Sequence, residues 1–393
     1  MRYAAITDRL KDLGGDKWAI HNAARARMAK GEEVIELTIG EPDITPDPAL
    51  IEECVTALRS GRTRYSNGRG EAGLVDALVE TYRPRMPDIG PENVLCFPGT
   101  QTALYAVFTA LTSDGDGVLI GDPYYATYEG VVQASGAHVQ PVPLHMEHDF
   151  ELQPADLASA ITPESRVLLL NTPHNPTGAV LTRDTLLALG ELCIAHDLWI
   201  VCDEVYEALI FDGSFASPLE IEALRERTIV VSSISKSHAA TGFRSGWAIG
   251  PAEFTRRLLP ISETMLFGNQ PFIADMTEAA LRGNYPTAAL LREALGRRAA
   301  LVHGLVQQVP GLSSRLPAGG MFIMIDVSGT GLDGDAFATR LIEEHGVAVM
   351  PGSSFGNEGL NLVRVALTVP DADLREALSR MGTLSRSLLA GAA

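Results

Sequence analysis

Residues 228–247 read TIVVSSISKSHAATGFRSGW, and this stretch places a lysine just beyond a buried strand. The apolar, β-branched run 228–231 is typical of a strand covered on both faces. Lys236 then lies near the carboxyl end of that strand, where open α/β sheets build their sites. Burial and the nearby cation Arg244 would lower its pKa, and a neutral amine can form a Schiff base with an aldehyde. The alternative is an ordinary exposed loop lysine.

The composition is that of a globular protein large enough for two domains. The chain has 393 residues, 46% of them hydrophobic, and a formal net charge of −18. This excess of acidic over basic residues argues against non-specific binding to nucleic acid or to anionic lipid headgroups. The sequence has no run of about 18 consecutive apolar residues, as a membrane span requires, and no signal-peptide pattern at its start. We therefore expect a protein that is neither exported nor membrane-embedded.

The cysteines favour a reducing compartment. The four cysteines show no CxxC spacing, and Cys96 and Cys202 lie in apolar runs typical of buried strands. Structural disulfides are rare in the cytosol, so cysteines of this kind are expected to be reduced core residues there. The sequence thus predicts a cytoplasmic protein.

Strand-like and helix-like segments alternate through the first two thirds of the chain. Apolar runs of strand length occur at 94–97, 118–120, 167–170, 199–202, 228–231 and 247–249. Helical patterns occupy 100–111 and 183–196, with Thr182 a candidate N-cap for the second. Alternating strands and helices predict an α/β fold with a mostly parallel sheet covered on both faces.

The last third has a different pattern and predicts a smaller α+β domain. A long helical stretch at about 286–309 is followed by strand patterns at 321–327, 347–350 and 362–367 and by helices at 335–345 and 371–389. We therefore divide the chain into an amino-terminal segment, 1–43, that packs with the small domain, a large domain, 44–285, and the small domain, 286–393.

Two strand ends offer groups suited to a phosphorylated planar ligand. In PGTQTAL (98–104), Gly99 and Thr100 lie at a strand-to-helix junction, whose free backbone amides suit a phosphate dianion. In GDPYYATY (121–128), Tyr125 could present its ring to a planar heterocycle, although packing of the rim is the simpler interpretation.

Two further strand ends offer an amide and a carboxylate. NTPHNPTG (171–178) directly follows a strand and presents Asn175, while WIVC (199–202) leads into Asp203 and Tyr206. A proline-rich turn and a helix N-cap are the alternatives for these two segments. Because every segment follows a strand, we expect the phosphate cradle, amide, carboxylate and amine to share one edge of the sheet.

This combination resembles the class I/II, fold type I aminotransferases that use pyridoxal 5′-phosphate (PLP), over essentially the whole chain. Their SxSK and TGxRxGW segments are matched by Ser233, Ser235, Lys236, Thr241, Gly242, Arg244, Gly246 and Trp247. The resemblance implies a large domain with a mostly parallel seven-stranded sheet, a smaller α+β domain, PLP as the cofactor and a homodimer with shared active sites. It implies no metal.

The resemblance also implies a role for each site residue. The catalytic residues would be Lys236, which forms the Schiff base and moves the substrate proton, Asp203, which pairs with the pyridine nitrogen, and Tyr206. The cofactor contacts would be Gly99, Thr100, Gln101, Tyr125, Asn175, Asp203, Tyr206, Ser233, Lys236 and Arg244, with Tyr65 reaching the phosphate of the neighbouring subunit. The substrate contacts would be Gly40, Asn175, Trp18 and Arg364, the last gripping the α-carboxylate.

The substrate side chain is less constrained by these motifs. Some aspartate-specific relatives have a lysine at the position of Gln101, and a buried distal carboxylate without a cationic partner would be costly. The runs KSHAATGFRSGW and AHDLWIVCDEVYEALIFDG are similar to those of arginine:pyruvate transaminases, a subgroup of the family. We expect a basic or neutral donor, such as arginine, and a 2-oxo acid acceptor such as pyruvate or 2-oxoglutarate. An aspartate or aromatic aminotransferase, a C–S β-lyase and a ligand-sensing regulator are the alternatives.

Overall fold

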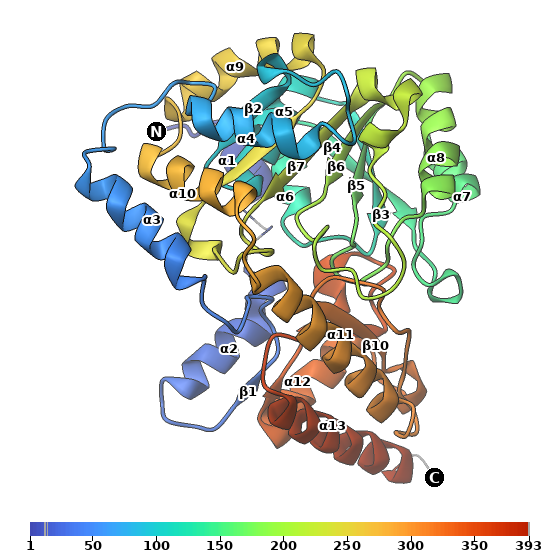
Figure 1. The fold of residues 1–393 in the computed structure, drawn as a ribbon. Helices are drawn as coiled ribbons and strands as arrows, with labels where there is room; N and C mark the ends of the chain where they lie inside the picture. The colour runs from blue at the N-terminus through green and yellow to red at the C-terminus, as the bar shows by residue number, and fades with distance from the viewer. Residues whose placement is uncertain (12, 14, 392–393) are drawn as a thin grey trace.

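The computed structural model describes residues 1–391 apart from residues 12 and 14, so the end of the expected 286–393 domain lies outside the described residues. Figure 1 shows a layered α/β body above a smaller body of helices and short strands. The larger body contains a seven-stranded sheet in the order β2-β8-β7-β6-β5-β3-β4. Its strands are β2 (Val94–Phe97), β3 (Gly117–Asp122), β4 (His138–Pro143), β5 (Ser165–Asn171), β6 (Trp199–Asp203), β7 (Thr228–Ser233) and β8 (Gly246–Ile249).

The sheet is mostly parallel, as expected. β3 pairs in parallel with β4 and β5, and β5, β6 and β7 continue the parallel order, whereas β8 runs antiparallel to both β2 and β7. The carboxyl ends of β3, β5, β6 and β7 therefore meet at one edge. The turns that follow these strands all open toward the smaller body.

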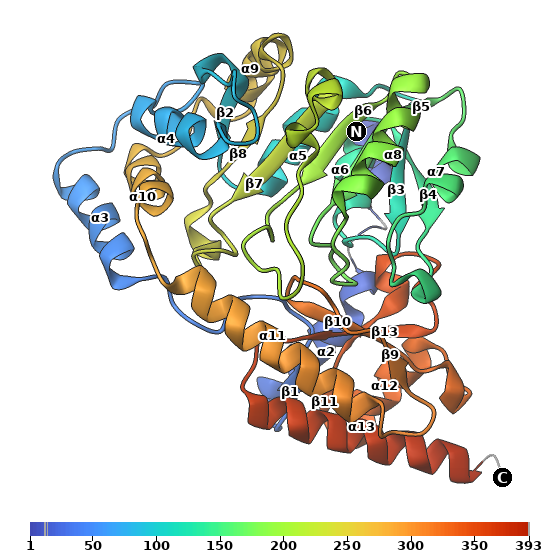
Figure 2. The same cartoon turned by 45° about the vertical axis from the view of Figure 1, so that its right-hand side comes forward.

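Helices cover both faces of the sheet (Figures 1 and 2), because neighbouring side chains along a strand point to opposite faces. Leu168 and Leu170 of β5 pack into a core with α4, α8 and α10, whereas Val167 and Leu169 pack with α5, α6 and α9. The helices of this body are α3 (Pro48–Arg59), α4 (Ala72–Tyr82), α5 (Thr100–Leu111), α6 (Tyr128–Ala134), α7 (Pro154–Ala160), α8 (Arg183–Ala195), α9 (Ala252–Leu266) and α10 (Pro271–Arg282).

The smaller body has its own sheet and core. A four-stranded sheet has the order β12-β13-β10-β9, and a two-stranded sheet pairs β1 with β11. The strands are β1 (Ile35–Glu36), β9 (Ser313–Ser314), β10 (Phe322–Asp326), β11 (Val347–Ala348), β12 (Met350–Pro351) and β13 (Leu362–Ala366). The helices are α11 (Thr287–Val306), α12 (Gly334–His345) and α13 (Asp371–Gly391). The expected strand at 347–350 is thus split, since β11 pairs with β1 and β12 pairs with β13.

The amino-terminal segment contacts both bodies. Helix α2 (Ala19–Met28) and strand β1 pack with α12 and β11 of the smaller body. Helix α1 (Ala5–Leu10) lies instead against α6 of the larger body. The helix buries none of its side chains, and Arg9 Nε donates to the carbonyl oxygen of Gln133 at 2.9 Å. Polar contacts of this kind leave no apolar pattern by which the sequence could place α1.

None of the helices within the described part of the chain combines the length and the apolar composition needed to cross a bilayer.

Candidate active site

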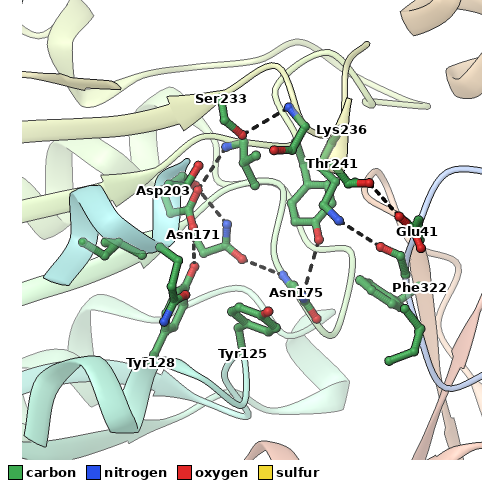
Figure 3. Close-up of a pocket in the computed structure, with 18 of the residues that line it drawn as sticks. Glu41, Tyr125, Tyr128, Asn171, Asn175, Asp203, Ser233, Lys236, Thr241 and Phe322 are labelled. Atoms are coloured by element: carbon green, nitrogen blue, oxygen red, sulfur yellow. Dashed lines mark hydrogen bonds between the residues drawn. The ribbon is translucent and has the colours of Figure 1, made fainter. Parts of the chain in front are cut away.

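A cavity of about 330 Å³ opens at the carboxyl edge of the large sheet, where it meets the smaller body (Figure 3). This size lies within the range of small-molecule sites, about 300–1,000 Å³. The cavity wall brings together most of the residues expected from the sequence: Trp18, Gly40, Thr100, Gln101, Tyr125, Asn175, Asp203, Tyr206, Ser233, Lys236, Arg244 and Arg364. Gly99 lies beside this wall, against Arg244, while Tyr65 lies elsewhere.

Lys236 lies in the turn that follows β7, and its Nζ donates a hydrogen bond to the carbonyl oxygen of Gly40 at 2.9 Å. Burial lowers the pKa of this lysine to about 8, an effect that Glu41 opposes and that the positive charges of Arg364 and Arg244 reinforce. The neutral form, which a nucleophilic amine requires, is therefore a minority near physiological pH but far more populated than in an ordinary lysine.

The shifted pKa of Lys236 predicts how cofactor uptake depends on pH. Because only the neutral amine attacks an aldehyde, the rate constant for uptake of PLP, the cofactor that the resemblance implies, should rise through about pH 8 and then level off. Stopped-flow absorbance measures this rate. Glu41→Gln should move the midpoint to lower pH, because Glu41 raises the pKa of Lys236. A rate constant that stays flat between about pH 6 and about pH 9 would contradict the assignment of Lys236 as the attacking amine.

Asp203 ends β6 with a buried, oriented carboxylate. The Tyr128 hydroxyl donates to Oδ2 at 2.8 Å, and the Val205 backbone N–H donates to Oδ1 at 3.1 Å. Burial raises the pKa of Asp203 to about 6, while these two hydrogen bonds and the charge of Lys236 oppose that rise. A cationic group bound beside this carboxylate would keep it ionised, because an opposite charge favours the charged form.

Asn175 links the floor of the site to the smaller body. Its backbone N–H donates to Asn171 Oδ1 at 2.8 Å, and its Nδ2 donates to the Tyr206 hydroxyl at 3.5 Å. Its Oδ1 accepts from Arg364 Nη1 at 3.0 Å. Burial raises the pKa of Tyr206, so its hydroxyl stays protonated and can donate to an anionic oxygen.

One end of the cavity is shaped for a phosphate. Gly99 has φ +91°, and a Cβ at that position would lie 2.2 Å from Arg244 Nη2, so only glycine permits this approach. Thr100 begins α5, and its buried Oγ1 has no hydrogen-bond partner among the described residues. The helix amides, the Thr100 and Ser233 hydroxyls and the Arg244 guanidinium therefore converge on a site that suits a dianion.

Arg364 is a buried cation that is only partly satisfied. Its guanidinium carbon lies 4.0 Å from the ring centre of Phe322 and 4.4 Å from that of Phe355. Nη2 donates to the Thr38 carbonyl oxygen at 2.7 Å, and Nε has no partner in the described part of the chain. Burial lowers its pKa to about 10. A carboxylate ligand would supply the missing partner, since an unpaired buried charge is costly.

Three expected residues, Tyr65, Trp18 and Gln101, differ in how they lie relative to the cavity. Tyr65 has an exposed fraction of 88% and meets Phe267 edge-on at 5.5 Å, outside the cavity. Trp18 lies in the cavity wall with His21 6.0 Å away, and Gln101 Oε1 accepts from Thr127 Oγ1 at 3.1 Å. Within the single chain, therefore, Tyr65 does not reach the site where the other residues meet.

Sequence reasoning missed several residues of the site. Tyr128 and Asn171, which orient Asp203 and Asn175, lie within the quoted segments GDPYYATY and NTPHNPTG, so their positions at strand ends were an available signal. Glu41, whose Oε1 accepts from Thr241 Oγ1 at 2.6 Å, follows directly after Gly40. Phe322 had no such signal, because an apolar residue in a strand is typical of core.

The chain belongs to the class I and II aminotransferases. The profile of the family described as "Aminotransferase class I and II" matches residues 32–381. The arginine–pyruvate transaminase AruH of Pseudomonas aeruginosa is 41% identical over 390 residues, with 99% of each chain covered. An aspartate aminotransferase of Geobacillus stearothermophilus is 32% identical, covering 86% of this chain and 88% of its own.

Solved structures agree on the fold. The aspartate aminotransferase of Thermus thermophilus with maleate superposes with a TM-score of 0.91 at 31% identity, covering 98% of this chain and all of its own. A Pyrococcus protein gives a TM-score of 0.93 at 30% identity, covering 98% of this chain and 100% of its own. The protein is thus an α/β fold type I PLP-dependent transferase and a transaminase.

The cofactor is PLP, and the residues of the cavity fit it. The partnerless Thr100 hydroxyl and the space that a Cβ on Gly99 would fill suit the phosphate, while Asp203 and Lys236 suit the ring nitrogen and the aldehyde. The described residues hold no cluster of three or more His, Cys, Asp or Glu side chains arranged to bind a metal ion.

Proposed function

We propose that this aminotransferase takes its amino group from a basic or neutral L-amino acid, arginine in particular, and gives it to a 2-oxo acid such as pyruvate or 2-oxoglutarate. The observation that carries this proposal is the set of cations in the cavity. Among the described residues of its wall, the cationic side chains are Lys236, Arg244 and Arg364. Lys236 and Arg244 lie at the cofactor end and Arg364 suits the α-carboxylate, so a distal carboxylate would meet the neutral Gln101 instead. The similarity to an arginine–pyruvate transaminase supports the same donor.

We assign the chemistry to this chain's own groups. PLP, when bound, supplies an aldehyde and a ring that takes up electrons from the substrate Cα. Arg364 binds the α-carboxylate with its planar fork and orients the Cα–H bond. Lys236, whose lowered pKa leaves part of its amine neutral, would take the Cα proton and act as the proton shuttle of the site. Asp203 would pair with the ring nitrogen and favour its protonated form.

The remaining cavity residues position the cofactor and the substrate. Tyr206 and Asn175 would donate to the phenolic oxygen and Tyr125 would stack on the ring. The phosphate would be held by Gly99, Thr100, Gln101, Ser233 and Arg244. Gly40 and Trp18 complete the wall around the substrate. Their common location in or beside one cavity supports these assignments.

We also propose an oligomeric state, a domain division and a cellular location for this protein. We infer a homodimer in which Tyr65 reaches the partner's phosphate, which the exposure of Tyr65 and Phe267 supports. We divide the chain into an amino-terminal segment 1–43, a PLP-binding domain 44–285 and a small domain 286–393. An apolar core centred in each body supports this division, although each core also includes some residues of the other body. The four cysteines are free and buried, which supports a cytoplasmic location.

The donor assignment predicts a specificity switch at Gln101. Gln101→Lys should raise kcat/KM for aspartate relative to arginine by about tenfold or more, because the new cation would pair with the distal carboxylate and repel a guanidinium. Stopped-flow absorbance of the bound cofactor with single amino acids measures each half-reaction. A wild-type enzyme that reacts faster with aspartate or glutamate than with arginine and neutral donors would refute the donor assignment.

An assay without the 2-oxo acid acceptor distinguishes a C–S β-lyase from a transaminase. A transaminase stops after one turnover per site without a 2-oxo acid, whereas a lyase continues, because its cofactor returns to the aldehyde in each cycle. Product formation should therefore equal the concentration of active sites until pyruvate is added. Sustained multiple turnover without an acceptor would favour the lyase.

A further inference from the structure

Asp122, outside the cavity wall, joins the large sheet to the segment that supports Arg364. It is the last residue of β3, and the residue has an exposed fraction of only 3%. Oδ2 accepts the backbone N–H of Asn357 at 2.9 Å, and Oδ1 accepts that of Glu358 at 3.2 Å. Hydrogen bonds to an ionised acceptor are stronger than neutral ones, so this contact fixes the backbone of residues 357–358.

A backbone contact extends this junction to Phe355. The N–H of Tyr124 donates to the carbonyl oxygen of Phe355 at 2.7 Å. Gly356, between the two contacts, has φ +129°, and a Cβ there would lie 2.1 Å from Asp122 Oδ1. The segment 355–358 therefore packs so closely against the end of β3 that only glycine fits at position 356.

Residues 355–358 lead directly to the substrate-facing arginine. They connect the 3₁₀ turn at Gly352–Phe355 with β13, which carries Arg364. Phe355 is 1% exposed, and its ring centre lies 4.4 Å from the guanidinium carbon of Arg364. The opposite ring, Phe322, belongs to β10, next to β13 in the same sheet. Of the two rings that clamp Arg364, only Phe355 is thus anchored to the large sheet.

We propose that Asp122 is a positioning residue for substrate recognition: it holds Phe355 against Arg364 and so fixes the guanidinium that receives the substrate carboxylate. This inference rests on the proposed role of Arg364. Donor and acceptor both carry a carboxylate beside the reacting carbon, so both depend on this guanidinium. PLP binding depends instead on groups at the ends of β2, β5, β6 and β7 and on the ring of Tyr125, whereas the Asp122 carboxylate forms its hydrogen bonds with Asn357 and Glu358.

The test compares substrate and cofactor binding in one variant. Asp122→Asn replaces one acceptor oxygen by an NH₂ group that faces a backbone N–H, so one of the two contacts is lost. We expect the KM values for arginine and pyruvate to rise about tenfold each, with a smaller change in kcat, and the dissociation constant for PLP to stay within about twofold. Asp114→Asn, at an exposed aspartate before β3, is the matched control and should behave as wild type.

A second variant tests whether Asp122 acts through Phe355. Phe355→Leu should raise both KM values, and the double variant should raise them little beyond Phe355→Leu alone, because the two changes remove the same support. Gly356→Ala disturbs the same contact between Asp122 and residues 357–358 from the side of the segment, and it should also raise both KM values. This variant keeps the test available if Asp122→Asn does not fold. Circular dichroism identifies the folded variants.

Three results would overturn the inference. The first is a wild-type KM for both substrates in folded Asp122→Asn or Gly356→Ala. The second is a loss of PLP affinity as large as the rise in KM. The third is a double variant whose rise in KM equals the product of the rises in Asp122→Asn and Phe355→Leu. The role of Arg364 is tested separately with Arg364→Lys. Unchanged KM values in that variant would refute the proposed carboxylate site itself, whatever the Asp122 variants show.

Discussion

Replacing Lys236 with alanine should lower kcat for transamination by at least about 10⁴-fold, because the variant loses the amine that we propose both binds PLP covalently and moves the substrate proton. The chain should remain folded, since Lys236 makes one hydrogen bond, to Gly40, and alanine removes a charge that burial disfavours. Steady-state kinetics with arginine and pyruvate measures the loss.

A covalent readout separates this result from misfolding. After borohydride reduction, mass spectrometry of the wild-type enzyme should show PLP attached to Lys236, and the alanine variant should show no attached PLP. Lys30→Ala, at an exposed lysine between α2 and β1, is the matched control and should keep wild-type activity and labelling. Labelling that persists in Lys236→Ala would refute the central assignment.

Replacing Asp203 with asparagine should lower kcat/KM by about 10³-fold, because a neutral amide of the same shape cannot stabilise a positive charge on the ring nitrogen. Asparagine preserves the volume of the buried side chain: its one oxygen can accept from the Val205 backbone N–H, and its NH₂ group can donate to the Tyr128 hydroxyl, which accepts as well as donates. The protein should therefore fold and bind PLP, with the loss concentrated in the chemical step. Single-turnover kinetics of each half-reaction measures that step directly.

Tyr128→Phe separates the charge of Asp203 from its orientation. It keeps the carboxylate but removes the hydrogen bond to Oδ2, so we expect a smaller fall in kcat/KM, about tenfold. That hydrogen bond also lowers the pKa of Asp203, so its loss should move the acidic limb of the pH–rate profile to higher pH. If Asp203→Asn kept nearly full activity, the role assigned to this carboxylate would be wrong.

Elements with strong local patterns were predicted well from the sequence. Strand β2 and helix α5 have the expected bounds, and the Thr182 hydroxyl accepts from the Thr185 backbone N–H as the expected N-cap of α8. The strand of the large sheet that was missed, β4, reads HVQPVP and lies at the edge of the sheet with alternating exposure, so it lacks a continuous apolar run. An edge strand of this kind is defined by its partner, β3, more than by its own composition.

The sequence by itself determined which chemical groups stand at the carboxyl edge of the sheet. Each of Thr100, Asn175, Asp203 and Lys236 follows closely on its own strand, and the carboxyl ends of parallel strands meet at one edge. That relation is local in the chain, so a pattern along the sequence could predict it. Family motifs then supplied the expected roles.

Only the tertiary structure decided how distant segments complete the site. Arg364 reaches Asn175 across 189 positions of the chain, and Lys236 reaches the carbonyl of Gly40 across 196. The support of Asp122 for the segment before β13 is of the same kind. Such contacts depend on how the two bodies pack against each other, and neither propensity nor periodicity along the chain carries that information.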